Sequence, residues 1–298
     1  MIIAITGSSG LVGGALIHAL EADGHLIRAV VRRAPRAGSD EIRWDPDNGT
    51  IDAAEFAGVD AVVHLAGENI AGHRWTKSFK DKILASRVRS TKLLCDTLSN
   101  LASKPAVLVS ASAIGYYGDR GSELVDESAT CGHGFLAEVC QQWEAATTVA
   151  RDADIRVVNL RIGFVLSKDG GGLAKMLTPF RLGVGGVIGS GNQYISWIAL
   201  DDLVRVIQFA LSAAALVGPV NATAPNAVTN REFTKTLGSV LHRPTIFPMP
   251  AFAAKLAFGE MADEMLLGSI RVEPRALSNA RFEFHYPQLD AALCRALA

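Results

Sequence analysis

Short apolar runs alternate with longer helical patterns through the first part of the chain. Largely apolar runs at residues 2–5, 26–31, 61–67, 107–110 and 155–161 each suit one buried strand. Between them, apolar residues recur at spacings of three and four, as on the buried face of a helix. Such alternation is typical of a parallel sheet with helices on both faces. The pattern therefore predicts an α/β fold with a Rossmann-type doubly wound parallel sheet.

Several stretches predict individual elements. Asn48-Gly49 favours a turn between two short extended pieces within residues 42–51. One long helix is expected over 76–99, and another from 135 toward 150. Asp201-Asp202 is expected to open a helix, because aspartate there can cap the helix and complement its dipole.

The residue composition of the chain changes after residue 165. Glycines become frequent between 170 and 191, and prolines separate short helical stretches from 246 onward. We therefore expect a nucleotide-binding domain over 1–165, with later returns to it near 195–240. Residues 166–298 are expected to form a loop-rich excursion and a smaller C-terminal substrate lobe, mainly 246–298.

A glycine-rich loop follows the first strand directly and opens the first helix. Its spacing is Gly7-x-x-Gly10-x-x-Gly13, close to the G-x-G-x-x-G of dinucleotide-binding proteins. Gly7 allows the tight turn, Gly10 lets a pyrophosphate approach the backbone, and Gly13 lets the helix pack closely. Free N–H groups and the positive end of the helix dipole make this an anion site. Strand, loop and helix together predict dinucleotide binding.

Two arginines end the second strand, where NAD-binding sites usually carry an acidic residue for the ribose 2′-hydroxyl. Arg32 and Arg33 suit a 2′-phosphate instead, which favours NADP (NADPH) over NAD. The alternative is a solvated basic loop, since arginines are common on surfaces.

Bulk properties exclude several function classes. The chain has 298 residues, of which 49% are hydrophobic and 20% charged, with a formal net charge of −1. This balance favours neither nucleic acid nor a membrane surface as a partner, and no apolar run reaches the ~18 residues of a membrane span. Four widely spaced cysteines suggest no metal site and no disulfide framework. With no signal-peptide pattern, a cytoplasmic location is expected.

Longer motifs resemble a known family. The glycine loop, the strand Val62–Gly67, Ser110-Ala111-Ser112 and Trp197–Leu203 resemble extended short-chain dehydrogenase/reductases of the epimerase/dehydratase type. Longer strings resemble an atypical branch of this group, the epimerase family proteins, which carry a C-terminal lobe of unknown function. These strings include Leu65–Ala71, Arg74-Trp75-Thr76, Ser112–Gly118, Pro179–Gly186, Gly189–Gln193 and Leu241–Pro244.

The resemblance implies an NADP-binding fold with a substrate cleft between the sheet and the C-terminal lobe. Arg87 falls where many relatives carry Asn, and a guanidinium there suits a phosphate or ribose; the alternative is a solvated helix arginine. The cofactor-binding residues expected from the motifs and the resemblance are Gly7, Ser9, Gly10, Leu11, Val12, Gly13, Arg32, Arg33, Leu65, Ala66, Gly67, Glu68 and Arg87.

The usual proton-transfer pair of this superfamily is missing. Relatives carry Tyr-x-x-x-Lys on one helical face, where the ammonium lowers the pKa of the tyrosine. Here Leu136 and Cys140 occupy the pair, or, with a shift of one residue, Phe135 and Val139. Standard hydride-transfer chemistry therefore lacks its usual acid.

Residues near the ends of the strands offer substitutes. Ser112, with Ser110 and Ala113 competing for the same alignment, is expected to hydrogen-bond a substrate oxygen. Tyr117 or its neighbour Tyr116 is expected to replace the lost phenol. Glu68 suits a base if it is buried. In the alternative interpretation these side chains serve only packing and turn chemistry.

Two functions follow. The first is an NADP-dependent oxidoreductase or epimerase with a non-standard active site, acting on an unknown small molecule. The second is a catalytically silent NADP-binding protein that senses redox state or serves a partner.

Overall fold

A computed structural model describes all 298 residues, and its centre is one eight-stranded sheet. The strands run in the order β12-β8-β6-β5-β1-β2-β3-β4, and every neighbouring pair is parallel except β3–β4. The strand order reverses between β1 and β5, the point where doubly wound sheets bind ligands. This arrangement confirms the predicted α/β, Rossmann-type fold. The strands are β1 (Ile2–Thr6), β2 (Leu26–Val31), β3 (Ile42–Asp45), β4 (Thr50–Ile51), β5 (Ala61–His64), β6 (Val107–Ala113), β8 (Arg156–Ile162) and β12 (Gly218–Ala222).

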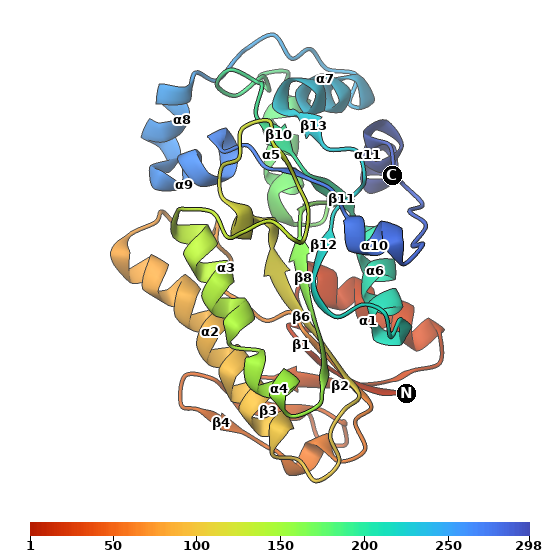
Figure 1. Ribbon diagram of the computed structural model, residues 1–298. Coiled ribbons are helices and arrows are strands. Elements are labelled where there is room, and N and C mark those ends of the chain that lie inside the picture. Colours follow the sequence, from red (N-terminus) through yellow and green to blue (C-terminus); the bar gives the residue numbers. More distant parts are fainter.

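Helices cover both faces of the sheet. Figure 1 shows α1 (Leu11–Ala22) and α6 (Leu200–Ser212) on one side and α2 (Lys77–Ser99), α3 (Phe135–Ala145) and α4 (Thr148–Asp152) on the other. Parallel strands joined by crossover helices are buried on both faces, which is why their sequences read as continuous apolar runs.

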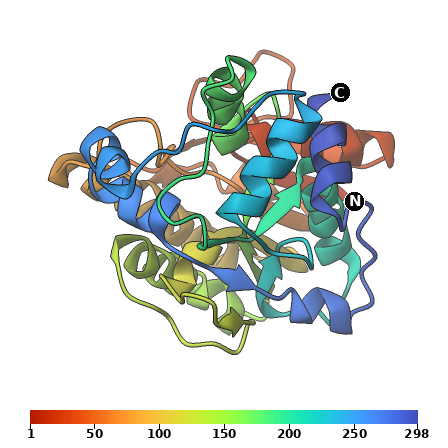
Figure 2. The same cartoon turned by 90° about the horizontal axis from the view of Figure 1, so that it is seen from above.

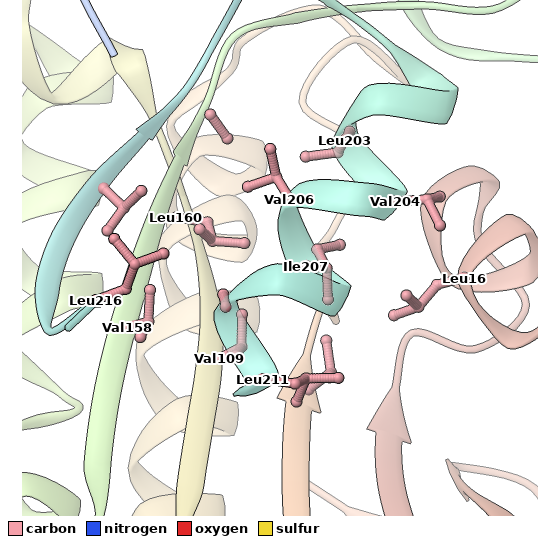
Figure 3. Close-up of a cluster of buried hydrophobic side chains, with 14 of the residues drawn as sticks. Leu16, Val109, Val158, Leu160, Leu203, Val204, Val206, Ile207, Leu211 and Leu216 are labelled. Atoms are coloured by element: carbon pink, nitrogen blue, oxygen red, sulfur yellow. The ribbon is translucent and has the colours of Figure 1, made fainter. Parts of the chain in front are cut away.

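The largest apolar core lies between α6, α1 and the strands β6 and β8 (Figure 3). Helix α6 directs Leu203, Val206 and Ile207 toward the sheet, and these side chains are fully buried. Their spacing of three and four places them on one stripe of the helix. On the strands, Val109 and Leu160 complete the contact.

The C-terminal lobe lies beyond the carboxyl ends of the strands, and seen from above its cyan and blue segments spread over that end of the sheet (Figure 2). Its elements are short, because prolines and glycines interrupt them. They are α5 (Gly171–Arg181), α7 (Asn230–Val240), α8 (Ala251–Phe258), α9 (Glu260–Ala262), the turn η3 (Asp263–Leu267), α10 (Arg275–Asn279) and α11 (Leu289–Leu297). Small two-stranded pairings connect it to the rest: β9 (Phe164–Leu166) with β11 (Trp197–Ala199), β10 (Tyr194–Ile195) with β13 (Val228–Thr229), and β7 (Leu124–Val125) with β14 (Arg271–Val272). Two 3-10 turns, η1 (Ala54–Phe56) and η2 (Ile114–Tyr117), complete the chain.

Most local expectations agree with the structure. The side chain of Thr76 caps α2 by accepting a hydrogen bond from the N–H of Phe79, and this fixes the start of that helix. Gly49 turns the chain between β3 and β4 with a φ of +67°.

Two expectations were wrong in detail. The single helix expected from 135 toward 150 is two helices, α3 and α4, and the hydroxyl of Thr147 at the break donates to the carbonyl of Glu144. Helix α6 follows Ala199 without a side-chain cap. Asp202 instead accepts hydrogen bonds from the N–H groups of His285 and Tyr286, so it fastens the C-terminal segment to α6.

No helix is both long and apolar enough to cross a membrane. All four cysteines are free, and of these Cys95 and Cys140 are buried.

The core of α6 predicts a large loss on truncation. We expect Leu203→Ala to lower the free energy of unfolding by about 2–5 kcal/mol, because a fully buried leucine leaves a cavity among rigid neighbours. Leu256→Ala is the matched control, since Leu256 is 77% exposed, and should change stability by less than about 0.5 kcal/mol. Urea denaturation followed by circular dichroism measures both, and equal losses would contradict this description of the core.

Candidate functional site

The loop after β1 approaches other backbone so closely that only glycine fits. A Cβ atom on Gly7, which has a φ of +68°, would lie 2.8 Å from the carbonyl carbon of Leu65. A Cβ on Gly13 would lie 2.2 Å from the carbonyl oxygen of Gly7. These contacts bring the N-terminus of α1 against the ends of β1 and β5.

The first turn of α1 has no side-chain cap. Gly10 stands at the N-cap position and its N–H donates to the carbonyl of Gly7 at 3.0 Å. Ser9 and Gly10 are exposed, whereas Leu11 and Val12 are half-buried. Leu11 reaches Gly170, just before α5. The N–H groups that open α1 are therefore free of protein side chains, as an anion site requires.

A buried polar chain holds the ends of β1 and β5 in register. Thr6 Oγ1 accepts hydrogen bonds from the N–H groups of Leu65 and Ala66 at 3.1 and 3.2 Å. Its own proton goes to His64 Nδ1 at 2.7 Å, so His64 Nε2 carries the ring proton and donates to Thr91 at 2.9 Å. Burial lowers the pKa of His64 to about 4, which keeps the ring neutral. His64 is thus a strand-end residue whose two ring nitrogens are both hydrogen-bonded within the protein.

Arg32 and Arg33 differ in their surroundings. Arg33 forms an ion pair with Glu41 and also donates to the carbonyl of Ala34. Hydrogen bonds from Arg33 and from the N–H of Arg36 lower the pKa of Glu41 to about 2. Arg32 is exposed and has no ion-pair partner. Of the two arginines, Arg32 is the one free to meet a ligand.

The loop after β5 is bordered by charged side chains. Glu68 pairs with Lys82 at 2.8 Å, and the hydrogen bond from Lys82 and its charge lower the pKa of the Glu68 carboxyl. Arg87 is half-buried and points inward, donating from Nη2 to the carbonyl of Glu68 at 3.0 Å. A Cβ on Gly67 would lie 3.3 Å from Arg87 Cζ, so the glycine leaves room for the guanidinium. This geometry does not fit a freely solvated arginine.

The two candidate pairs on α3 have different surroundings. Leu136 and Cys140 both approach Gly115 in η2, at 3.2 and 3.9 Å from a Cβ placed there. Phe135 and Val139 pack instead with the cluster around Trp75 and α2. Burial raises the pKa of Cys140 to about 12, so the thiol stays neutral. Whichever pair is considered, α3 contains neither a tyrosine nor a lysine.

Ser112 belongs to a charged network at the end of β6. Its hydroxyl donates to Glu144 Oε1 at 2.7 Å, and the side chain is nearly buried. Arg161 holds both carboxylate oxygens of Glu144 at 2.9 Å from Nε and Nη2. The ring of Tyr116 stacks on Arg161, whose Cζ lies 3.5 Å from the ring centroid.

Tyr117 lies at the inner end of the same network. Its ring is 0% exposed, its hydroxyl donates to Asn221 Oδ1 at 2.7 Å, and it accepts from Arg161 Nη1 at 2.9 Å. Burial raises the pKa of Tyr117 to about 12. This position does not suit the proton donor expected for Tyr117, because the hydroxyl is enclosed and both of its hydrogen-bonding functions are occupied.

Three residues of this network were not among the expected site residues. Glu144 lies one helical turn after Cys140, and Arg161 is a charged residue near the end of the mostly buried strand β8. A charged residue inside a buried strand needs a partner, so Arg161 carried a readable signal. No such signal marked Asn221, because the residue it contacts, Tyr117, lies 104 residues away in the sequence. No cluster of three or more His, Cys, Asp or Glu side chains is arranged to hold a metal ion.

Comparison with known families matches nearly the whole chain. Residues 3–222 match the model described as the NAD dependent epimerase/dehydratase family, and residues 249–296 match a domain of unknown function. An epimerase family protein of Mycobacterium tuberculosis is 46% identical over 292 residues, covering 98% of this chain and 96% of the relative. These matches confirm the resemblance inferred from the motifs.

Two solved structures share the architecture. The crystal structure of human epimerase family protein SDR39U1 with NADPH aligns with a TM-score of 0.90 at 34% identity, covering 99% of each chain. A nucleoside-diphosphate sugar epimerase from Corynebacterium glutamicum aligns with a TM-score of 0.82 at 38% identity, covering all of this chain and 58% of that one. The similarity includes the C-terminal lobe.

The neutral His64 predicts a pH-dependent stability. Its pKa is about 4 in the folded chain and about 6.5 when unfolded, so the unfolded chain binds the extra proton between these values. The stabilisation is complete above pH 6.5 and is lost as the pH falls toward 4. We expect a loss of roughly 2 kcal/mol between pH 7 and pH 5, measured by urea denaturation.

His64→Gln should flatten the pH dependence over this interval, while His18→Gln, at an exposed position on α1, should leave it unchanged. A wild-type slope that survives in His64→Gln would contradict the assignment.

Proposed function

Because the chain belongs to the NAD dependent epimerase/dehydratase family, we propose that it binds NADPH at the carboxyl edge of its sheet and transfers hydride between this cofactor and a small molecule. The observation that carries the proposal is the uncapped N-terminus of α1, pressed by Gly7 and Gly13 against the ends of β1 and β5. The human relative crystallised with NADPH supports the choice of cofactor.

The glycine loop suits the pyrophosphate. Free N–H groups at Leu11 and Val12 and the exposed Ser9 surround the position where a phosphate would meet the helix dipole. The segment Leu65–Glu68, held by Thr6, would line the adenosine side.

Arg32 and Arg33 would have different roles in recognising the 2′-phosphate. Arg32 is free to bind it, whereas Arg33 neutralises Glu41, whose carboxylate would otherwise repel the phosphate. No acidic residue ends β2 to bind a 2′-hydroxyl. This division supports NADPH over NADH.

Ser112 and Glu144 offer a route for the proton. A nicotinamide cofactor held by the N-terminus of α1 and by Arg32 would supply hydride-transfer chemistry at this edge of the sheet. As the substrate hydroxyl becomes a carbonyl, its proton passes to Ser112 Oγ while the hydroxyl proton of Ser112 passes to Glu144. Arg161 holds the carboxylate in place for this transfer.

A catalytically silent NADPH-binding protein is the second candidate function. It is favoured by Leu136 and Cys140, which supply no proton donor, and by the enclosure of Tyr117. In either case we place the protein in the cytoplasm, where a reducing environment suits its four free cysteines.

The cofactor proposal is tested with two arginine variants. Arg32→Ala should weaken NADPH binding by about tenfold to a hundredfold, the loss of a charge-assisted contact, and change NADH binding little. Arg33→Ala should have a smaller effect, since it acts through Glu41. Isothermal titration calorimetry with both nucleotides measures these changes, and equal losses for NADPH and NADH would refute the 2′-phosphate role.

The proton route is tested by turnover of NADP⁺ or NADPH with a panel of small alcohols and carbonyl compounds. Ser112→Ala and Glu144→Gln should lower turnover by about a hundredfold or more while NADPH still binds. Tyr117→Phe should cost stability but retain turnover, because its hydroxyl does not reach a substrate. A wild-type protein that binds NADPH and turns over no member of the panel would favour the silent candidate.

A further inference from the structure

The outer end of the C-terminal lobe carries a patch of exposed apolar side chains. Most of the large apolar side chains that are more than half exposed gather there, whereas the others lie apart, in or beside β2, β7 and β12. An apolar patch of this kind on a water-exposed surface commonly marks a contact site. We call it the lobe-end patch, and its members are Leu182 and Val184 after α5, Ile246 and Phe247 before α8, and Phe252 and Leu256 on α8.

Two segments that are distant in sequence meet in the lobe-end patch. The segment 243–249 runs beside the segment that follows α5. The N–H of Met249 donates to the carbonyl of Val187 at 2.8 Å, and Arg243 Nε donates to the carbonyl of Arg181 at 2.9 Å. In Figure 1 the segment from α7 to α8 crosses the top of the lobe, and Figure 2 looks down on this end. The patch is therefore one surface, built from both segments and α8.

Helix α8 has no polar face. Lys255 is the one polar residue in its sequence, and Ala254 is its one buried residue. Phe252 and Leu256 stand one helical turn apart and are 74% and 77% exposed. A helix that is apolar all round is normally buried. The side of α8 that bears these two side chains thus suits an apolar environment that the rest of this chain does not supply.

Unpaired cations border the lobe-end patch. Neither residues 170–200 nor residues 233–259 contain an aspartate or a glutamate. Arg181 at the end of α5, Lys235 on α7 and Arg243 between α7 and α8 are all exposed. The ion pair at this end of the lobe is that of Lys255, and none of the three cations takes part in one.

Acidic residues near the patch are already engaged. Asp263 pairs with Lys255 at 2.7 Å, and Glu260 pairs with Lys80 at 2.7 Å. On α7, Glu232 closes the capping box at the start of its own helix. The surface around the patch therefore carries an excess of positive charge that acidic residues of this chain do not balance.

This charge separates the possible partners. In a two-fold dimer the same surface of both copies meets. The cations of one copy would then face those of the other with no acidic residue between them, and like charges at short distance repel one another. An anionic partner is favoured instead. A membrane that contains anionic lipids offers both an apolar layer for Phe252 and Leu256 and phosphates for the bordering cations.

We propose that the lobe-end patch binds the surface of anionic lipid membranes, with its apolar side chains at the headgroup boundary and its three unpaired cations on lipid phosphates. The near-zero net charge of the whole chain does not oppose such binding, because an exposed charge acts over a Debye length of about 8–10 Å. The contact requires no membrane-spanning helix. It is also independent of the proposed cofactor.

Co-sedimentation of the full chain with lipid vesicles tests the proposal. We expect binding to phosphatidylcholine vesicles that contain about 30% phosphatidylglycerol, and at least tenfold weaker binding to phosphatidylcholine alone, which has no net charge. Raising the ionic strength from about 0.1 M to about 1 M should weaken the binding by about tenfold or more, because the Debye length falls to about 3 Å.

Two double variants locate the contact. F252S/L256S removes apolar area and R181Q/K235Q removes charge, and each should lower the affinity for the anionic vesicles by about tenfold or more. All four side chains are exposed, so the fold should be retained, which thermal unfolding checks. Val217→Ser and Arg89→Gln, at exposed positions outside the lobe, are the matched controls and should change the affinity by less than about twofold.

Several results would overturn the proposal. One is a wild-type protein that binds neither kind of vesicle, and another is equal binding to both kinds. Binding to anionic vesicles that both double variants leave unchanged would place the membrane contact elsewhere on the molecule. Analytical ultracentrifugation adds a further arm: a dimer that F252S/L256S dissociates, without any vesicle binding by the wild type, would assign the patch to a second copy of the chain.

Discussion

The close approach of three backbone segments at the end of β1 is the constraint on which the site depends. Gly7 and Gly13 leave no space for a Cβ, so the loop after β1, the start of α1 and the segment after β5 meet within van der Waals distance. A side chain at either position would push α1 away from the sheet. The uncapped N–H groups of α1 then occupy the point where strand order reverses. The position of the proposed cofactor follows from this packing.

Two polar networks hold the neighbouring strand ends in place, and one of them is neutral whereas the other contains an ion pair. The chain from Thr6 through His64 to Thr91 is neutral, and its members satisfy one another. The network around Arg161 is charged but fully paired, as burial of a guanidinium demands. Arg87 lies between the two and lacks such pairing.

The surroundings of α3 show which polar groups lie near the helix that lacks Tyr and Lys. Helix α3 contains neither tyrosine nor lysine, and Arg87 on α2 lies 5.0 Å from the ring of Trp143 on α3. The site still holds a polarised hydroxyl, Ser112 on Glu144.

Local patterns made the fold predictable, and distant contacts limited what could be predicted of the site. The apolar runs and the glycine spacing each act over a few residues, so the sheet, α1 and α2 could be expected from sequence. The contrast between Arg32 and Arg33 depends on Glu41, which lies just before β3. The enclosure of Tyr117 depends on Asn221, from the far edge of the sheet. Such partners can be identified only once the order of the strands in the sheet is known.

The C-terminal lobe also supplies distant contacts, in this case to the first turns of α2 and α3. Glu264 accepts hydrogen bonds from the N–H groups of Phe135 and Leu136 at 2.7 and 2.8 Å, and so caps α3 from another part of the chain. Glu260 pairs with Lys80 on α2 at 2.7 Å. The two helices that carry Arg87 and Cys140 are therefore both anchored to the lobe at the end nearest the proposed cofactor. Contacts between segments about 130 to 180 residues apart in sequence thus fix the first turns of both helices.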